Sequence, residues 1–330
     1  WYYLYKGEIL MEAKLISVVV PMYREEEVAG ECYNRLSNVL KEIKYEYEII
    51  FVDDGSEDRT FEIVSSIAKY DSKVKVIKFS RNFGHQAALT AGVDASCGDA
   101  VVTIDADLQD PPELMIEMIK RWEEGFHVVY AKRRKRDGET WFKLITAKCF
   151  YKTIRKLSDV KMPVDTGDYR LMDRKVVEVL KDMPETNRYM RGMVSWTGFK
   201  QTPVEYDRKE RFAGKTKYPL NRMVKLALDG MVSFSSKPLR VAEYLGFFAV
   251  IVAIIIFLYA FIYKIIGGKN LVTGWASIMT TVTFLGGVQL ITIGILGEYI
   301  GRIYDETKER PLYIVEKKIN ICDKDKEKVR

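Results

Sequence analysis

Short apolar runs alternate with longer amphipathic stretches through the first part of the chain. The runs at 15–20, 47–52, 74–79 and 101–104 have the length of strands, and a stretch with helical spacing follows each of the first three. The run at 15–20 is almost continuously apolar and ends at Pro21, which is typical of a strand that is buried on both faces. We therefore expect an α/β fold with βαβ units, right-handed crossovers and a Rossmann-like, mostly parallel sheet.

The same pattern places the helices and a further strand. Helices are expected at 25–44, 58–70 and 85–96, and a fifth strand is expected at 128–132. The acidic residues at 25–27 would then lie in the first turn of the first helix, where the helix dipole favours negative charge.

The last third of the chain contains two uncharged runs. Leu245–Tyr263 and Trp275–Leu296 contain no Asp, Glu, Lys or Arg, and about 20 apolar residues cross the hydrocarbon core of a bilayer. Between 219 and 240, apolar residues recur at helical spacing, which predicts an amphipathic helix at the membrane interface. We expect two transmembrane helices joined by a short linker.

These patterns divide the chain into five parts. The parts are a leader at 1–10, an α/β domain at 11–218, a juxtamembrane helix at 219–240, a transmembrane hairpin at 241–300 and a tail at 301–330. The leader is expected to be disordered or not native, because Met11 has the surroundings of a natural start.

Charge distribution and cysteine spacing indicate where in the cell the protein is located. The formal net charge is +6, and basic residues flank the uncharged runs at Lys237 and Arg240 and again at Arg302 and Lys308. The positive-inside rule then predicts a cell-membrane protein whose α/β domain and C-terminus are both cytoplasmic. No basic motif with interleaved aromatic residues indicates nucleic-acid binding. The four cysteines lack C-x-x-C spacing, which indicates reduced thiols and neither a disulfide framework nor a zinc site.

Acidic and amide side chains follow the fourth strand. Asp105, Asp107 and Gln109 stand at alternate positions, and Pro111-Pro112 prevents continuation as a central strand. These side chains offer hard oxygen ligands, which suit Mg²⁺ or Mn²⁺ more than zinc, and such ions usually bridge carboxylates to substrate phosphates. The alternative is a polar turn that leads into the next helix. With two histidines in the chain, a histidine-based metal site or triad is not expected.

Polar or turn-forming residues also follow the other strands. Pro21, Asp53 and Asp105 all fall at carboxyl ends, where ligands collect in parallel sheets. Taken alone, Asp53–Ser56 is a strand-to-helix turn in which Gly55 takes a positive φ and Ser56 or Asp58 caps the helix. The repetition of acids at one edge of the sheet favours a binding site.

Two later segments carry further candidates. Arg133–Glu139 is strongly basic, and it is either a solvated face or a site for a phosphate group, since guanidinium forks match phosphate oxygens. In Asp165–Asp173, Asp173 is placed to cap a helix that starts near Arg174. Asp168 is not needed for that cap, and it becomes the candidate second catalytic carboxylate.

Four motifs resemble those of one enzyme family. Pro21–Glu25, Asp53–Ser56, Asp105–Gln109 and Arg211–Tyr218 are similar to motifs of the inverting family 2 glycosyltransferases, which have the GT-A fold. The resemblance is greatest to the polyprenyl-phosphate glycosyltransferases, which include the bactoprenol glucosyltransferases and the dolichol-phosphate mannose synthases. It covers about residues 14–315. One departure is Arg24, because family members usually carry Asn there.

The resemblance implies a role for each candidate residue. The base and ribose of a nucleotide sugar would be bound by Pro21, Tyr23, Glu25 and Asp53. The ion on the diphosphate, Mg²⁺ or Mn²⁺, would be held by Asp105, Asp107 and Gln109. The catalytic carboxylates would be Asp168, near the acceptor phosphate, and Asp107. The acceptor phosphate itself would be bound by Arg133, Arg136, Arg211 and Lys215.

The expected activity is hexose transfer, with glucose from UDP-glucose favoured, onto polyprenyl (undecaprenyl) phosphate for cell-envelope glycosylation. UDP-N-acetylglucosamine and GDP-mannose are the alternative donors. A processive polysaccharide synthase would need a Q-x-x-R-W motif and more membrane helices, and an inactive membrane-anchored scaffold would have lost the acids that are present here. Glycines at 286, 287, 294 and 297 suit close helix packing, which would allow homo-oligomers.

Overall fold

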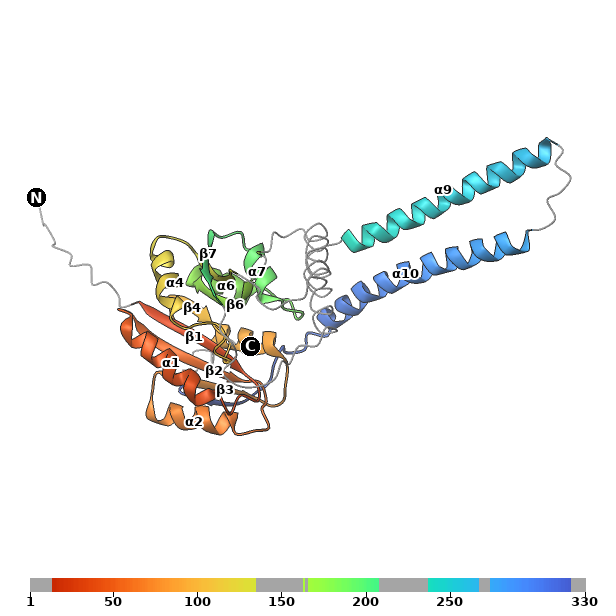
Figure 1. Cartoon of the computed structure of the whole chain (residues 1–330). Helices are drawn as coiled ribbons and strands as arrows, with labels where there is room; N and C mark the ends of the chain where they lie inside the picture. The colour runs from red at the N-terminus through yellow and green to blue at the C-terminus, as the bar shows by residue number, and fades with distance from the viewer. Residues whose placement is uncertain (1–13, 135–162, 164–165, 208–236, 267–273, 322–330) are drawn as a thin grey trace, which may run out of the picture. The chain divides into compact units, whose positions relative to one another are not determined.

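The structure is a computed structural model that describes residues 14–134, 163, 166–207, 237–266 and 274–321. The chain forms two compact units, and the second, 148–160 with 220–310, is inserted between parts of the first. The first unit contains the sheet, and the second contains the two long helices α9 and α10 (Figure 1).

The first unit is built on an eight-stranded sheet with the order β7-β5-β6-β4-β1-β2-β3-β8. The pairs β1–β2, β1–β4, β2–β3 and β5–β7 are parallel, and β4–β6, β5–β6 and β3–β8 are antiparallel. The strands are β1 Leu15–Met22, β2 Glu46–Asp53, β3 Val74–Phe79, β4 Ala100–Thr103, β5 Val128–Arg133, β6 Thr166–Asp173, β7 Gln201–Tyr206 and β8 Val315–Ile319.

The helices of this unit follow the strands as the βαβ pattern predicts. They are α1 Ala29–Glu42, α2 Thr60–Tyr70, α3 His85–Ala95, α4 Leu114–Glu123, α6 Arg174–Asp182 and α7 Met190–Trp196. The first helix starts later than expected, because Glu25 lies in a preceding turn in which its carbonyl accepts the N–H groups of Val28 and Ala29. The mostly parallel α/β sheet is confirmed.

The central strands are apolar because both of their faces are covered. In β1, Val18, Val19 and Val20 are fully buried, and Ile50 and Phe51 of β2 are buried with them. Full burial of each such side chain contributes about 1.5–3 kcal/mol to folding. The polar residues at the carboxyl ends of these strands therefore stand on a rigid support.

Three strands, β6, β7 and β8, were not expected from the sequence. The helix expected near Arg174 is present as α6, and Asp173 caps it by accepting the N–H of Lys175 at 2.9 Å. The segment before it was not expected to be a strand, but most of it forms β6, which lies between β4 and β5 with six of its eight residues buried. Asp168 and Arg170 in this strand hide its apolar pattern. The sequence also gave no sign of β8, which pairs with the edge strand β3.

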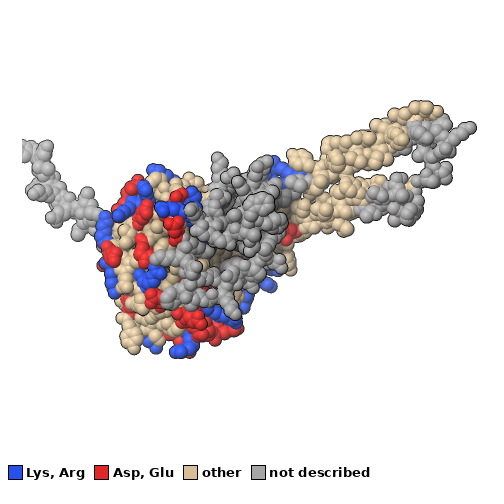
Figure 2. All heavy atoms as spheres, viewed as in Figure 1, with Lys and Arg blue, Asp and Glu red and all other residues tan. Residues whose placement is uncertain are grey.

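The second unit contains two long helices, α9 Lys237–Ile265 and α10 Trp275–Thr307, which lie side by side (Figure 1). Their surface is mainly uncharged, whereas Lys, Arg, Asp and Glu are spread among uncharged residues over the described part of the visible face of the sheet unit (Figure 2). Within the described residues, one stretch, Phe284–Thr307, is apolar and long enough to cross a membrane, and Ala242–Ile256 of α9 is apolar over a shorter length. The juxtamembrane helix expected at 219–240 lies mostly outside the described residues.

Candidate active site

The candidate site is built on the carboxyl ends of β1, β2 and β4. Asp53, the last residue of β2, is buried, and its Oδ1 accepts the N–H of Ser56 at 3.2 Å. Burial raises the pKa of Asp53 above its usual value. Its Oδ2 is buried and has no hydrogen-bond partner among the described residues, so this carboxylate retains an unused acceptor.

The turn after β2 also contacts the loop after β3 and fixes its position. Gly55 has a φ of +67°, as expected, and a Cβ there would come within 2.3 Å of the backbone of Arg81. The carboxylate of Asp54 accepts the N–H groups of Phe83 at 2.7 Å and of Gly84 at 2.9 Å. Asp54 therefore fixes the start of α3, whose first residue is His85.

The turn after β4 presents the candidate metal ligands. Asp105 is two residues beyond the end of β4, and its side chain is about one-third exposed. Asp107 Oδ1 accepts the N–H of Gln109 at 3.2 Å, and Leu108 between them has a φ of 56°. Partial desolvation by the surrounding protein raises the pKa of Asp105 to about 6, although the neighbouring His85 acts in the opposite direction.

Asp168 lies beside this turn because β6 is antiparallel to β4. The hydroxyl of Thr103 donates to the carbonyl of Asp168, and the Asp168 side chain is buried. Arg191 of α7 donates from Nε to Oδ1 at 2.9 Å and from Nη2 to Oδ2 at 3.1 Å. Burial alone would raise the pKa of Asp168, but the charges and hydrogen bonds of Arg191 and His85 outweigh it and hold this pKa well below its usual value.

His85 lies between the two carboxylates. Its Nε2 is 3.3 Å from Asp168 Oδ2 and 3.6 Å from Asp105 Oδ1. Desolvation alone would lower the pKa of His85, but the hydrogen bond to Asp168 and the charge of Asp105 raise it to about 9. The neighbouring Gln86 donates to Asp168 Oδ2 at 3.4 Å and accepts the N–H of Met190 at 2.8 Å, which ties α3 to α7.

Arg133 is connected to the metal-ligand turn from the other side. Its Nε donates to the hydroxyl of Tyr206 at 3.1 Å, and that hydroxyl donates to Asp110. Arg133 Nη2 is also 3.9 Å from Asp110 Oδ1. The backbone of β6 is close by, since a Cβ at Gly167 would lie 3.4 Å from Arg133 Nη2.

The structure therefore brings most of the candidate residues to one edge of the sheet. Pro21 is in β1 opposite Val52, Tyr23 follows that strand, and Glu25 donates its N–H to Thr60 Oγ1 at 2.9 Å. Arg136, Arg211 and Lys215 lie outside the described residues. Sequence reasoning missed several side chains that the fold adds to this edge, namely Asp54, His85, Gln86, Arg191 and Tyr206.

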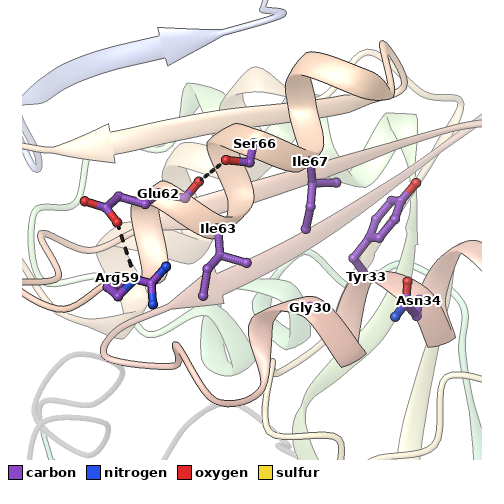
Figure 3. A pocket seen from close by; sticks show the side chains of 8 residues that line it. All are labelled: Gly30, Tyr33, Asn34, Arg59, Glu62, Ile63, Ser66 and Ile67. Carbon is purple, nitrogen blue, oxygen red and sulfur yellow. Dashed lines mark hydrogen bonds and ion pairs between the residues drawn. The ribbon is translucent and has the colours of Figure 1, made fainter.

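A groove elsewhere on the sheet unit contains none of these residues. It lies between α1 and α2 and is lined by Gly30, Tyr33, Asn34, Arg59, Glu62, Ile63, Ser66 and Ile67 (Figure 3). Glu62 pairs with Arg59 at 3.5 Å, and its carbonyl accepts the hydroxyl of Ser66. The candidate residues therefore lie outside this groove, at the carboxyl ends of the central strands.

Comparison with known protein families gives two matches. Residues 17–181 match the family described as Glycosyl transferase family 2, and residues 237–303 match the GtrB C-terminal hairpin. The first match contains Asp53, Asp105, Asp107 and Asp168, and the second contains α9 and most of α10.

Curated relatives match over nearly their whole length. The chain is 53% identical over 310 residues to the uncharacterized glycosyltransferase YkcC of Bacillus subtilis, which covers 93% of this chain and 95% of the relative. It is 45% identical over 302 residues to the bactoprenol glucosyl transferase of Shigella phage SfII, and this alignment covers 92% of this chain and 97% of the relative.

Solved structures are more distant. Glucosyl-3-phosphoglycerate synthase of Mycobacterium tuberculosis, solved with UDP-glucose and Mn²⁺, is 21% identical, with a TM-score of 0.45 over 66% of this chain and 78% of that one. One conclusion follows from the α/β sheet, from the family match over residues 17–181 and from the relatives at 45–53% identity. The chain belongs to glycosyl transferase family 2, and its sheet unit has the GT-A fold.

Proposed function

We propose that this protein transfers glucose from UDP-glucose to polyprenyl phosphate at a membrane surface. The observation that carries this proposal is the 45% identity, over 92% of the chain, to a bactoprenol glucosyl transferase. The separate match of residues 237–303 to the GtrB hairpin supports it. In the reaction, a phosphate oxygen of the acceptor forms a bond to the anomeric carbon as the bond to the diphosphate breaks, and UDP leaves.

Asp53 supports a uracil base in the donor half of the site. Its Oδ1 already accepts the N–H of Ser56, and its buried Oδ2 has no partner among the described residues. Burying an acceptor without a donor costs free energy, and the single N–H at the edge of uracil would satisfy it. Guanine presents two adjacent N–H groups, for which one free oxygen is a poorer match.

Asp105, Asp107 and Gln109 would hold a divalent ion on the donor diphosphate. In the described part of the chain, no group of three or more His, Cys, Asp or Glu side chains is arranged to hold a metal by itself. Two carboxylates and an amide suit Mg²⁺ or Mn²⁺ that takes its remaining ligands from substrate phosphates and water. When bound, the ion would neutralise charge on the departing diphosphate.

The acceptor half would be formed by basic residues beyond the metal-ligand turn. Arg133 is held near that turn by Tyr206, and Asp168 lies on the adjacent strand. Guanidinium groups match phosphate oxygens in geometry and charge, which supports Arg133 as an acceptor-phosphate residue. The remaining acceptor candidates, Arg136, Arg211 and Lys215, are proposed from the sequence resemblance.

α9 and α10 would anchor the enzyme as two transmembrane helices. Large apolar side chains on both helices are exposed, including Phe247, Ile255, Leu290 and Ile293. Contiguous apolar surface of this kind marks contact with a membrane or a partner. We place the sheet unit and the C-terminus in the cytoplasm, and association of copies through the glycines of α10 stays a prediction.

The test is an assay of product formation with membranes that contain the full chain. Undecaprenyl phosphate is incubated with UDP-glucose, UDP-N-acetylglucosamine or GDP-mannose, and the lipid product is identified by mass spectrometry. We expect glucosyl transfer that EDTA abolishes and that Mg²⁺ or Mn²⁺ restores. Transfer of another sugar would refute the donor, and full activity of Asp107→Ala in EDTA would refute the metal site.

A further inference from the structure

The carboxylate of Asp168 is enclosed by hydrogen-bond donors. Arg191 donates to both oxygens, at 2.9 and 3.1 Å, while Gln86 and His85 approach Oδ2 at 3.4 and 3.3 Å. Oδ1 thus has one of these contacts and Oδ2 has three. The Asp168 side chain is also only 6% exposed. A reactant therefore has little direct access to this carboxylate.

His85 is the member of this cluster that remains available. Its side chain is 32% exposed, its hydrogen bond to Asp168 at 3.3 Å is longer than the two that Arg191 makes, and Asp105 Oδ1 is 3.6 Å away. Arg191 has a similar exposure, but Nε, Nη1 and Nη2 already donate to Asp168 or to the carbonyl of Thr166 at 2.9–3.1 Å. The N–H of His85 can thus turn to a new acceptor at smaller cost than a donor of Arg191.

A hydrogen-bond donor at this position would favour the binding of a phosphate group. A phosphate that approaches the Asp105 side of the cluster comes near the Asp105 carboxylate, and like charges at close range repel. His85 lies between the carboxylates of Asp105 and Asp168, and as the first residue of α3 it also stands where the helix dipole favours an anion.

We propose that His85 contacts a phosphate oxygen of the reactants and that Asp168 acts through His85 as a positioning residue. The inference deepens the proposed function and rests on it. The phosphate group belongs to the acceptor monophosphate or to the donor diphosphate, and the first experiment below distinguishes the two.

The first experiment observes the imidazole directly. The chain has two histidines, so the full-length protein in detergent micelles, labelled with ¹³C-histidine, gives two sets of ring signals, and His127→Gln assigns them. Farnesyl phosphate and UDP with Mg²⁺ serve as separate probes. We expect one probe to shift the His85 signals saturably while the His127 signals stay in place.

The outcomes of this experiment are distinct. A shift with farnesyl phosphate assigns the acceptor, and a shift with UDP alone assigns the donor. Binding of both probes in calorimetry without any shift of His85 overturns the inference. Failure of both probes to bind in calorimetry removes the proposed function and this inference with it.

The second experiment is a double-mutant cycle on kcat/KM for polyprenyl phosphate. His85→Ala should lower this value about tenfold or more, as the loss of a charge-assisted hydrogen bond does, and His85→Gln should recover part of it because its amide can donate in place of Nε2. If Asp168 acts through His85, His85→Ala with Asp168→Asn should be little worse than the more damaging single change. If the loss in the double variant equals the product of the two single-variant losses, Asp168 acts independently of His85, and the inference is overturned.

Discussion

Single side chains in this site are placed by residues that are far away in the sequence. Asp54, at the end of one strand, accepts two backbone N–H groups just before α3 and so sets the position of His85. His85 then meets Asp168, which β6 delivers from much later in the chain. The chemistry of each side chain is local, but its orientation depends on the whole sheet.

Arg24 is a residue whose backbone conformation does not suit its side chain. Its φ is 54°, a left-handed conformation that Asn tolerates better than most residues. Its guanidinium pairs with the exposed Glu57, and such surface pairs contribute little. We expect Arg24→Asn to be more stable than Arg24→Ala by roughly 0.5–1 kcal/mol, because both lose the ion pair and differ in backbone preference. Thermal unfolding of the two variants checks this, and equal midpoints would contradict it.

Asp168→Asn tests whether this carboxylate acts on the acceptor or on the nucleotide-sugar donor. The change keeps the shape of the side chain but removes the charge that Arg191 and His85 face, so the cluster would lose its alignment. We expect kcat to fall about 100-fold, the scale of a small misplacement at a reaction centre, with UDP-glucose affinity almost unchanged. Calorimetry with Mn²⁺ present measures that affinity, and a large loss of donor binding would place Asp168 in the donor half.

The sequence was informative about residues whose role follows from their neighbours. Asp105, Asp107 and Gln109 stand together after an apolar run, so their common position could be predicted. His85 and Arg191 could not be found in this way, because no local pattern joins them to Asp168. Because the chain has two histidines, a histidine-based triad was not expected, and the position of His85 between two carboxylates was not anticipated.

At the scale of elements, α7 orients Asp168 in the candidate site but contributes no candidate catalytic group. Its position brings Arg191 onto both oxygens of Asp168 and onto the carbonyl of Thr166. The parallel core could be predicted because its strands are short, mainly apolar runs that alternate with helical stretches. Strand β6 could not, because Asp168 and Arg170 interrupt its apolar pattern, and Asp168 is compensated in the fold by Arg191 and His85, which are distant in the sequence.

Arg191→Lys tests this role of α7. Lysine keeps the charge but not the planar fork, so Asp168 would lose one of its two fixed contacts. We expect kcat to fall about tenfold or more, the cost of a lost charge-assisted hydrogen bond, with donor affinity unchanged. Arg188→Lys is the matched control, since Arg188 bonds the carbonyls of Leu180, Met183 and Glu185 and no group of the site. Equal losses in both variants would indicate a structural effect only.

At the scale of the molecule, one unit is polar and the other exposes apolar helices. The second unit is inserted into the first, so the chain leaves the sheet unit before α9 and returns to it after α10. The length and hydropathy of the two apolar runs could be predicted from the sequence. The return of the chain as strand β8 could not, because Val315–Ile319 carries charges at three of its five positions.

Cysteine labelling tests the proposed membrane topology. In a background without the native cysteines, Asn270→Cys in the linker between α9 and α10 should react with an impermeant thiol reagent added to intact cells. Lys317→Cys in β8 should react only after the cells are opened, because we place the sheet unit in the cytoplasm. The reverse pattern would contradict the positive-inside prediction.

The pairing of β8 with β3 has a consequence for synthesis of the protein. Asn320 donates from Nδ2 to the carbonyl of Val74, 246 residues earlier, so the last contacts of the sheet join segments that the ribosome makes at very different times. Until β8 emerges, β3 is an open edge strand of the kind that pairs with other chains. The sheet can close only after both apolar helices have been translated, so a nascent chain would have to keep this edge protected through that interval.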